Sequence, residues 1–95
     1  MKVHIALLRA TISIPEAHSL KDKRRVVKSL KDRTVNHMNV SVAEVGQQEV
    51  WNRAELAFVT VAAEKKVVEK RLSDIAQRLE RNHEWVLLEV KTEFL

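Results

Sequence analysis

The pattern of apolar and polar positions along the chain predicts four strands and two helices. Alternation of apolar and polar residues indicates strands over 2–14, 40–45, 55–62 and 85–95, and helical spacing of apolar residues indicates helices over 20–36 and 64–81. Ser19, followed three residues later by Asp22, is a capping pattern that starts the first helix. The predicted order is therefore strand–helix–strand–strand–helix–strand.

Two strand–helix units separated by a hairpin predict an α+β fold of the ferredoxin-like class, as a single domain over residues 1–95. This fold implies an antiparallel sheet in the order 4-1-3-2 with both helices on one face. It brings four segments to one end, here called the top rim: the end of the first strand, the start of the first helix, the loop between strands two and three, and the end of the second helix. In the last strand we expect the core face to carry Val86, Leu88, Val90 and Phe94.

Composition narrows the class of protein. Cysteine is absent, which excludes disulfides and thiolate metal sites and fits a cytoplasmic location. The first residues lack the apolar core of a signal peptide, and no apolar run approaches the roughly 20 residues of a membrane span, so no membrane partner is expected.

Positive charge is concentrated in the first helix. Residues 21–33 hold seven basic and two acidic residues, a net charge of +5, so the rest of the chain sums to −1 against a total of +4. At about 100° per residue, the basic residues gather on the side opposite the apolar face. The candidate anion- or nucleic-acid-binding residues are Lys21, Arg24, Arg25, Lys28 and Lys31. Such a row suits phosphate binding, and it is equally compatible with a solvated helix face.

Lys23 departs from that row, because its angle falls in the middle of the apolar arc. Glu44 shares parity with Val40 and Val42 in the second strand and therefore also faces the helices. We predict that Lys23 and Glu44 approach each other at the top rim as a structural pair. The alternative role for Lys23 is anion binding beside the positive end of the helix.

The loop between the second and third strands holds two further top-rim candidates, Trp51 and Arg53. A loop tryptophan commonly packs the hairpin onto the domain. The alternative is a stacking or partner contact, which the neighbouring glutamines and Arg53 favour.

No motif supports catalysis, a metal site or a cofactor. The chain has no glycine-rich phosphate loop and no nucleophile elbow, and its four histidines are divided between the two ends of the predicted fold. We expect no catalytic residue, no metal ligand and no cofactor.

Two segments resemble the YlxP-like family of small bacterial proteins. They are Ile-Ser-Ile-Pro-Glu-Ala-His-Ser-Leu-Lys-Asp-Lys-Arg-Arg-Val-Val-Lys-Ser-Leu-Lys from Ile12 and Asn-Val-Ser-Val-Ala-Glu-Val-Gly-Gln-Gln-Glu-Val-Trp-Asn-Arg-Ala from Asn39. The resemblance extends over essentially the whole chain. It implies a ferredoxin-like fold, a bacterial cytoplasmic protein without an assigned function, and, from the genes beside which members are often encoded, association with RNA or the ribosome.

Two hypotheses follow from these features. The first is a non-enzymatic accessory factor that binds structured RNA or the ribosome through the basic first helix and the top rim. The alternative is a homodimeric interaction module that pairs through the edge strand over 39–45, which contains neither proline nor lysine to block pairing.

Overall fold

The structure, a computed structural model, describes residues 2–95 and contains the six predicted elements in the predicted order. Their bounds are β1 His4–Ser13, α1 Leu20–His37, β2 Ser41–Gly46, β3 Arg53–Ala62, α2 Lys65–Glu80 and β4 Val86–Phe94. Each lies within two residues of its predicted bounds. Met1 belongs to the predicted domain over 1–95 but lies outside the described residues, and the division into domains stays a prediction.

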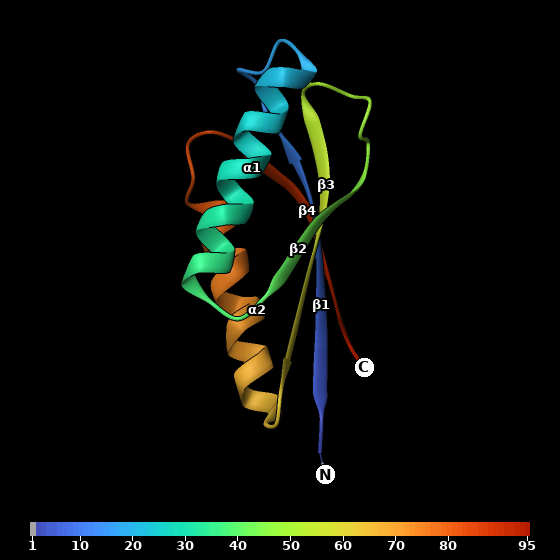
Figure 1. The fold of residues 1–95 in the computed structure, drawn as a ribbon, viewed down its shortest axis with the longest axis vertical. Coiled ribbons are helices and arrows are strands. Elements are labelled where there is room, and N and C mark those ends of the chain that lie inside the picture. Colours follow the sequence, from blue (N-terminus) through green and yellow to red (C-terminus); the bar gives the residue numbers. More distant parts are fainter. Residues whose placement is uncertain (1) are drawn as a thin grey trace.

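The four strands form one antiparallel sheet in the order β2-β3-β1-β4. This is the predicted order 4-1-3-2 named from the opposite edge. Both helices cover the same face, with α1 on β2 and β3 and α2 mainly on β1, β3 and β4 (Figure 1). The arrangement is consistent with the expected ferredoxin-like architecture. The molecule is elongated, with extents of 47 × 22 × 21 Å.

The hydrophobic core fills the space between the sheet and the two helices. Leu8 of β1 pairs in register with Phe58 of β3, and both are completely buried. Leu56, two residues before Phe58 in β3, shares the core face and is also completely buried. The helices contribute apolar residues at helical spacing: Val27 and Leu30 from α1, and Val68, Leu72, Ile75 and Leu79 from α2. Burial of these side chains away from water is the main force that joins the two layers.

The predicted core face of β4 is partly wrong. The register of β4 against β1 shifts between Thr11 and Ile12, so that Glu89 pairs with Thr11 and Leu87 pairs with Ile12. One residue, Leu88, is therefore left over in a β-bulge, and the alternation changes faces there. Leu87 packs against the core, whereas Leu88 and Val86 are about half exposed.

The start of α1 follows the predicted capping pattern. Ser19 is the N-cap, and its hydroxyl accepts a hydrogen bond from the Asp22 backbone N–H at 3.1 Å. The Asp22 carboxylate in turn accepts from the His18 backbone N–H at 3.0 Å. These bonds satisfy amide groups that a helix start leaves without intrahelical partners, and they hold the β1–α1 connection against the helix.

Candidate functional site

Lys23 occupies a buried position on the core side of α1, where its angle in the helix places it. Its side chain is 1% exposed, and its ammonium nitrogen lies 2.9 Å from Glu44 Oε2. The predicted approach of Lys23 and Glu44 is therefore confirmed. The same nitrogen donates hydrogen bonds to the Gln47 carbonyl at 2.9 Å and to the Gln48 carbonyl at 3.1 Å. Two hydrogen-bonded carbonyls and one carboxylate oxygen at ion-pair distance thus surround the ammonium group, which offsets much of the cost of burying its charge.

Glu44 completes the charge balance of this site. The register shift between Glu44 and Gly46 leaves Val45 as a bulge, and Glu44 pairs with buried Leu56, so its side chain faces α1. Its buried Oε2 is at ion-pair distance from Lys23 but has no hydrogen-bond partner among residues 2–95. The attraction at this oxygen is thus electrostatic, while the ammonium protons are directed to the loop carbonyls.

The Lys23 contacts fasten the β2–β3 loop to α1. The loop turns at Gln47, whose φ of 57° is left-handed, and the Val50 N–H donates to the Gln47 carbonyl at 3.1 Å. At the far end of the loop the Ile14 N–H donates to the Asn52 carbonyl at 2.8 Å. Both ends of the loop are therefore tied to the segments that surround the start of α1.

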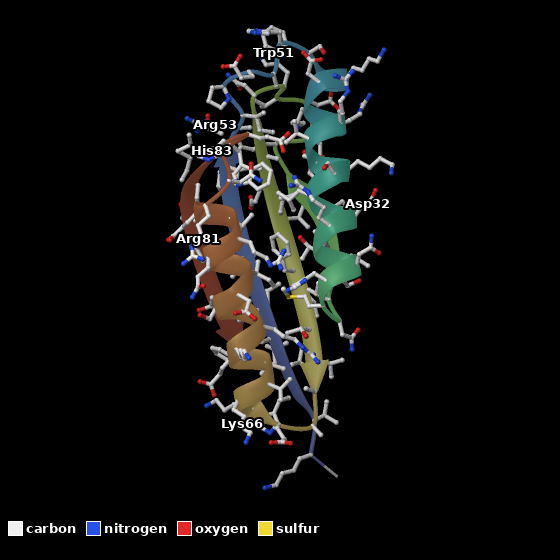
Figure 2. All side chains as sticks on the ribbon, turned by 90° about the vertical axis from the view of Figure 1, so that its left-hand side faces the viewer. Asp32, Trp51, Arg53, Lys66, Arg81 and His83 are labelled. Carbon is white, nitrogen blue, oxygen red and sulfur yellow. The ribbon has the colours of Figure 1, made fainter. Side chains whose placement is uncertain are left out.

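Trp51 lies on this fastened loop and is 54% exposed. Figure 2 shows it at the tip of the molecule, with Arg53 and His83 below it. The exposure does not support the interpretation that Trp51 packs the hairpin onto the domain, because Lys23 and Ile14 hold the loop instead. Arg53 opens β3 with a parity opposite to that of buried Ala54, so it lies on the face of the sheet away from the helices.

The predicted basic row lies along the outer side of α1, here called the basic stripe: Lys21, Arg24, Arg25, Lys28 and Lys31. Four of its members are exposed and Lys31 is partly buried. Lys28 pairs with Asp32 at 2.7 Å, and this hydrogen bond raises the pKa of Lys28. In the described part of the chain, no carboxylate lies within ion-pair distance of Lys21, Arg24 or Arg25.

Asp22, the acidic residue at the start of the basic stripe, already accepts a hydrogen bond from the His18 backbone N–H. The hydrogen bond from the His18 backbone N–H lowers the pKa of Asp22, and the Ser19 hydroxyl and the nearby Arg25 charge add to the effect. Asp22 therefore stays ionised as part of the helix cap. The first two turns of α1 thus present three cations, and the loop that Lys23 ties to α1 presents Trp51.

A second feature, a groove between the two helices, has no local signal in the sequence. It has a volume of about 460 Å³. Its walls carry the polar residues Arg33, Thr34 and His37 of α1 and Asp74, Arg78 and Arg81 of α2 and its end. No motif marks these residues, because they come together only through the spacing of the two helices.

Within residues 2–95, no three histidine, cysteine, aspartate or glutamate side chains gather in a group that fits a metal ion. No helix in the same range is both long and apolar enough to cross a membrane.

The fold and the fastened loop define a small α+β protein with one basic helix. The chain belongs to the family described as "Protein of unknown function (DUF503)", whose profile matches residues 5–92. The resemblance to the YlxP-like family is confirmed by the "Uncharacterized protein YlxP" of Bacillus subtilis (strain 168). That protein is 37% identical over 62 residues, which cover 65% of this chain and 67% of YlxP.

Comparison with solved structures supports the fold alone. The de novo designed protein Foldit4 has a TM-score of 0.58 at 14% identity, with 99% of this chain and 97% of that chain covered. The structural genomics protein YJCS is less similar, with a TM-score of 0.47 at 9% identity over 94% of this chain and 96% of that chain.

Proposed function

We propose that this chain is a non-enzymatic accessory protein of the bacterial cytoplasm, with a ferredoxin-like fold, that binds structured RNA, including ribosomal RNA. One observation carries the proposal: an exposed tryptophan on a loop that is tied at one end to Lys23, at the start of the basic helix, and at the other end to Ile14. Trp51 is 54% exposed, and Lys23 is 1% exposed while holding the carbonyls of Gln47 and Gln48. Buried Lys23 thus holds in place the loop that carries exposed Trp51.

The chemistry of that surface suits a phosphate backbone with an accessible base. Lys21, Arg24 and Arg25 are free to neutralise phosphates, which releases condensed counterions and supplies affinity without sequence selectivity. An exposed indole provides a stacking platform for an unpaired base at a loop or bulge. Because Lys23 ties the loop to α1, less conformational entropy is lost when RNA binds.

The opposite face of the sheet offers no comparable platform. Its two central strands carry no aromatic residue on that side; Arg9 there forms an ion pair with Glu55 at 2.9 Å. Two cross-strand apolar pairs, Ile5 with Val61 and Leu7 with Val59, occupy the other half of these strands. RNA binding by bases stacked on the sheet is therefore not favoured, and the helix side is the proposed surface.

A homodimer through β2 is the second candidate. The observation in its favour is that β2 is an edge strand with one unpaired side. Two features of the strand oppose pairing: the bulge at Val45 and the inward-pointing charge of Glu44. Both are devices that keep edge strands from pairing with another sheet, so the RNA proposal ranks first.

Sedimentation of bacterial ribosomes tests the proposal. The protein should move with ribosomal particles at low salt and stay at the top of the gradient at high salt, since its contacts are electrostatic. A variant with Lys21→Glu, Arg24→Glu and Arg25→Glu should stay at the top at both salt concentrations. The matched control reverses Lys65, Lys66 and Lys70, exposed lysines at the start of α2, and should still sediment with the particles. Absence of the wild-type protein from ribosomes and from free RNA at low salt would overturn the proposal.

A further inference from the structure

The groove between α1 and α2 lies on a different side of α1 from the basic stripe. Arg33 and His37, which line it, lie at about 220° and 260° around the helix when Leu20 is taken as zero, whereas Lys21 and Arg25 lie at about 100° and 140°. The two helices make few contacts with each other, because each packs mainly on the sheet. A ligand in the groove would therefore leave the proposed RNA surface free.

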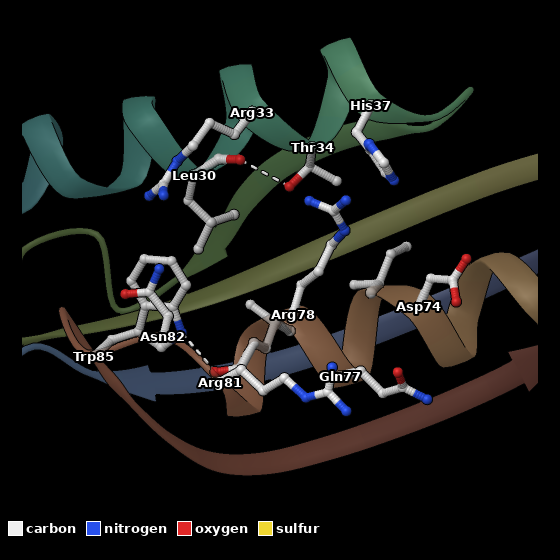
Figure 3. A pocket seen from close by; sticks show the side chains of 12 residues that line it. Leu30, Arg33, Thr34, His37, Asp74, Gln77, Arg78, Arg81, Asn82 and Trp85 are labelled. Atoms are coloured by element: carbon white, nitrogen blue, oxygen red, sulfur yellow. Dashed lines mark hydrogen bonds between the residues drawn. The ribbon is translucent and has the colours of Figure 1, made fainter.

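The floor of the groove is apolar and its rim is charged. Leu30, Ile75, Leu79 and Trp85 form the floor and are between 1% and 6% exposed. The Trp85 indole N–H donates to the Leu79 carbonyl at 2.9 Å, which fixes the ring at one end of the groove (Figure 3). A volume of about 460 Å³ is larger than a bare inorganic anion needs and falls in the range of small-molecule sites.

Arg78 is the central charge of the rim. Its side chain extends from α2 toward α1, and its guanidinium lies near Thr34 and His37 in Figure 3. Within residues 2–95 it has neither an ion-pair partner nor a side-chain hydrogen bond. Thr34 has its hydroxyl proton committed to the Leu30 carbonyl at 2.8 Å. The guanidinium of Arg78, an exposed residue that lines the groove, therefore has donors that no protein acceptor in residues 2–95 engages.

The other charged residues determine the net charge of the groove. Arg33 lies 5.9 Å from the centre of the Trp85 ring and forms an ion pair with Glu84 at 3.2 Å, outside the lining. Arg81 also lines the groove, and Asp74 is the one acidic lining residue. With Arg33 paired to Glu84, Arg78 and Arg81 against Asp74 leave a net charge of +1, before His37 is counted. A positive groove suits a phosphate monoester, which is close to a dianion at neutral pH.

We propose that the interhelical groove binds a small phosphomonoester with a flat, largely apolar body, of the nucleoside monophosphate class. The phosphate lies between Arg78 and the Thr34–His37 side of α1, where a guanidinium can hold two phosphate oxygens at once. The flat body lies over the apolar floor beside Trp85. Because the site uses neither the basic stripe nor Trp51, it goes beyond the proposed RNA function and stands independently of it.

Nuclear magnetic resonance titration of the full chain tests the site, because the two tryptophans report on different surfaces. The probes are adenosine 5′-monophosphate, adenosine and inorganic phosphate. Adenosine 5′-monophosphate should shift the indole N–H signal of Trp85 in a saturable way, with a dissociation constant of about 1 mM or lower, and leave that of Trp51 in place. Adenosine and inorganic phosphate, which each lack one half of the ligand, should bind at least about tenfold more weakly.

Variants locate the binding. Arg78→Gln should weaken binding of adenosine 5′-monophosphate about tenfold through loss of a charged hydrogen-bond donor. Arg24→Gln removes an exposed arginine from the basic stripe and should leave binding unchanged. No saturable shift of Trp85 up to about 10 mM, equal binding by inorganic phosphate, or unchanged binding in Arg78→Gln would each overturn the proposal. Loss of ribosome association in the stripe variant with unaltered groove binding would confirm that the two sites are separate.

Discussion

The ammonium group of Lys23 and the carboxylate of Glu44 meet 2.9 Å apart between α1 and the edge strand β2, and the Lys23 side chain is 1% exposed. The pair joins two elements and, through the carbonyls of Gln47 and Gln48, a loop. The Lys23 charge is held out of water beside Glu44 and two backbone oxygens, and Oε2 of Glu44 is itself buried. Removal of one partner therefore leaves the other without compensation.

Replacement of Lys23 by Met should destabilise the protein by about 3 kcal/mol, because it leaves Glu44 and two loop carbonyls without their cation. Urea unfolding followed by circular dichroism measures this loss. Arg24→Met, one position along the same helix but exposed, is the matched control and should change stability by less than about 0.5 kcal/mol.

A second variant separates the charge pair from the loop contacts. Adding Glu44→Leu to Lys23→Met removes the uncompensated carboxylate, and should recover part of the lost stability. Recovery should be incomplete, because the carbonyls of Gln47 and Gln48 still lack their donor. A cost below about 1 kcal/mol for Lys23→Met alone would show that the pair does not hold this region together.

The position of Lys23 could be predicted because a helix repeats every 3.6 residues and a strand every two. These periods place Lys23 among the apolar residues of α1 and Glu44 on the helix-facing side of β2, and both elements are regular up to these residues. The basic stripe was predictable for the same reason.

The exposed Trp51, the face change in β4 and the interhelical groove could not be predicted from the sequence. Whether Trp51 is buried or exposed depends on how its loop is held, and the loop is held by Lys23 and Ile14, which are distant from it along the chain. The β-bulge at Leu88 depends on how β4 pairs with β1, and a shift of one residue reverses the faces. The groove depends on the separation of two helices, which leaves no local pattern.

Thr60 should contribute to stability although it belongs to neither proposed binding site. It is 2% exposed, donates to the Asn39 carbonyl at 2.8 Å and accepts from Arg71 at 2.8 Å, and so links β3, the α1–β2 connection and α2. Thr60→Val keeps the shape and removes both bonds, and should cost about 1–3 kcal/mol in urea unfolding. Thr11→Val, on the other face of the sheet, should cost much less; equal effects would contradict this role.

Acid should weaken the start of α1 through Asp22. The pKa of Asp22 is lowered below its ordinary value of 3.8 in the folded protein, chiefly by the His18 backbone N–H. Its contribution is therefore present above that value and is lost as the pH falls through the lower, folded pKa. The melting temperature of Asp22→Asn should lie below that of the wild type at pH 6, and the difference should shrink as the pH falls below 3.8. A constant difference would contradict the assignment.

Substitution of Trp51 should weaken RNA binding, whereas substitution of Trp85 should lower the stability of the fold. Trp51→Ala should leave stability within about 0.5 kcal/mol of the wild type, because the side chain is half exposed, but weaken RNA binding about tenfold through lost stacking. Trp85→Phe removes the hydrogen bond to the Leu79 carbonyl and should cost about 1 kcal/mol or more of stability. Unaltered RNA affinity in Trp51→Ala would remove the indole from the proposed surface.

The most direct test of the RNA proposal is the salt dependence of binding to a labelled RNA hairpin, measured by fluorescence anisotropy. Lys28 is engaged by Asp32, so three free cations of the stripe, Lys21, Arg24 and Arg25, should contact phosphates. Log affinity should then fall against log salt with a slope of about −2.7, and reversal of the three residues to Glu should abolish binding while reversal of Lys65, Lys66 and Lys70 should not. A wild-type slope shallower than about −1, or equal binding by both variants, would contradict the proposal.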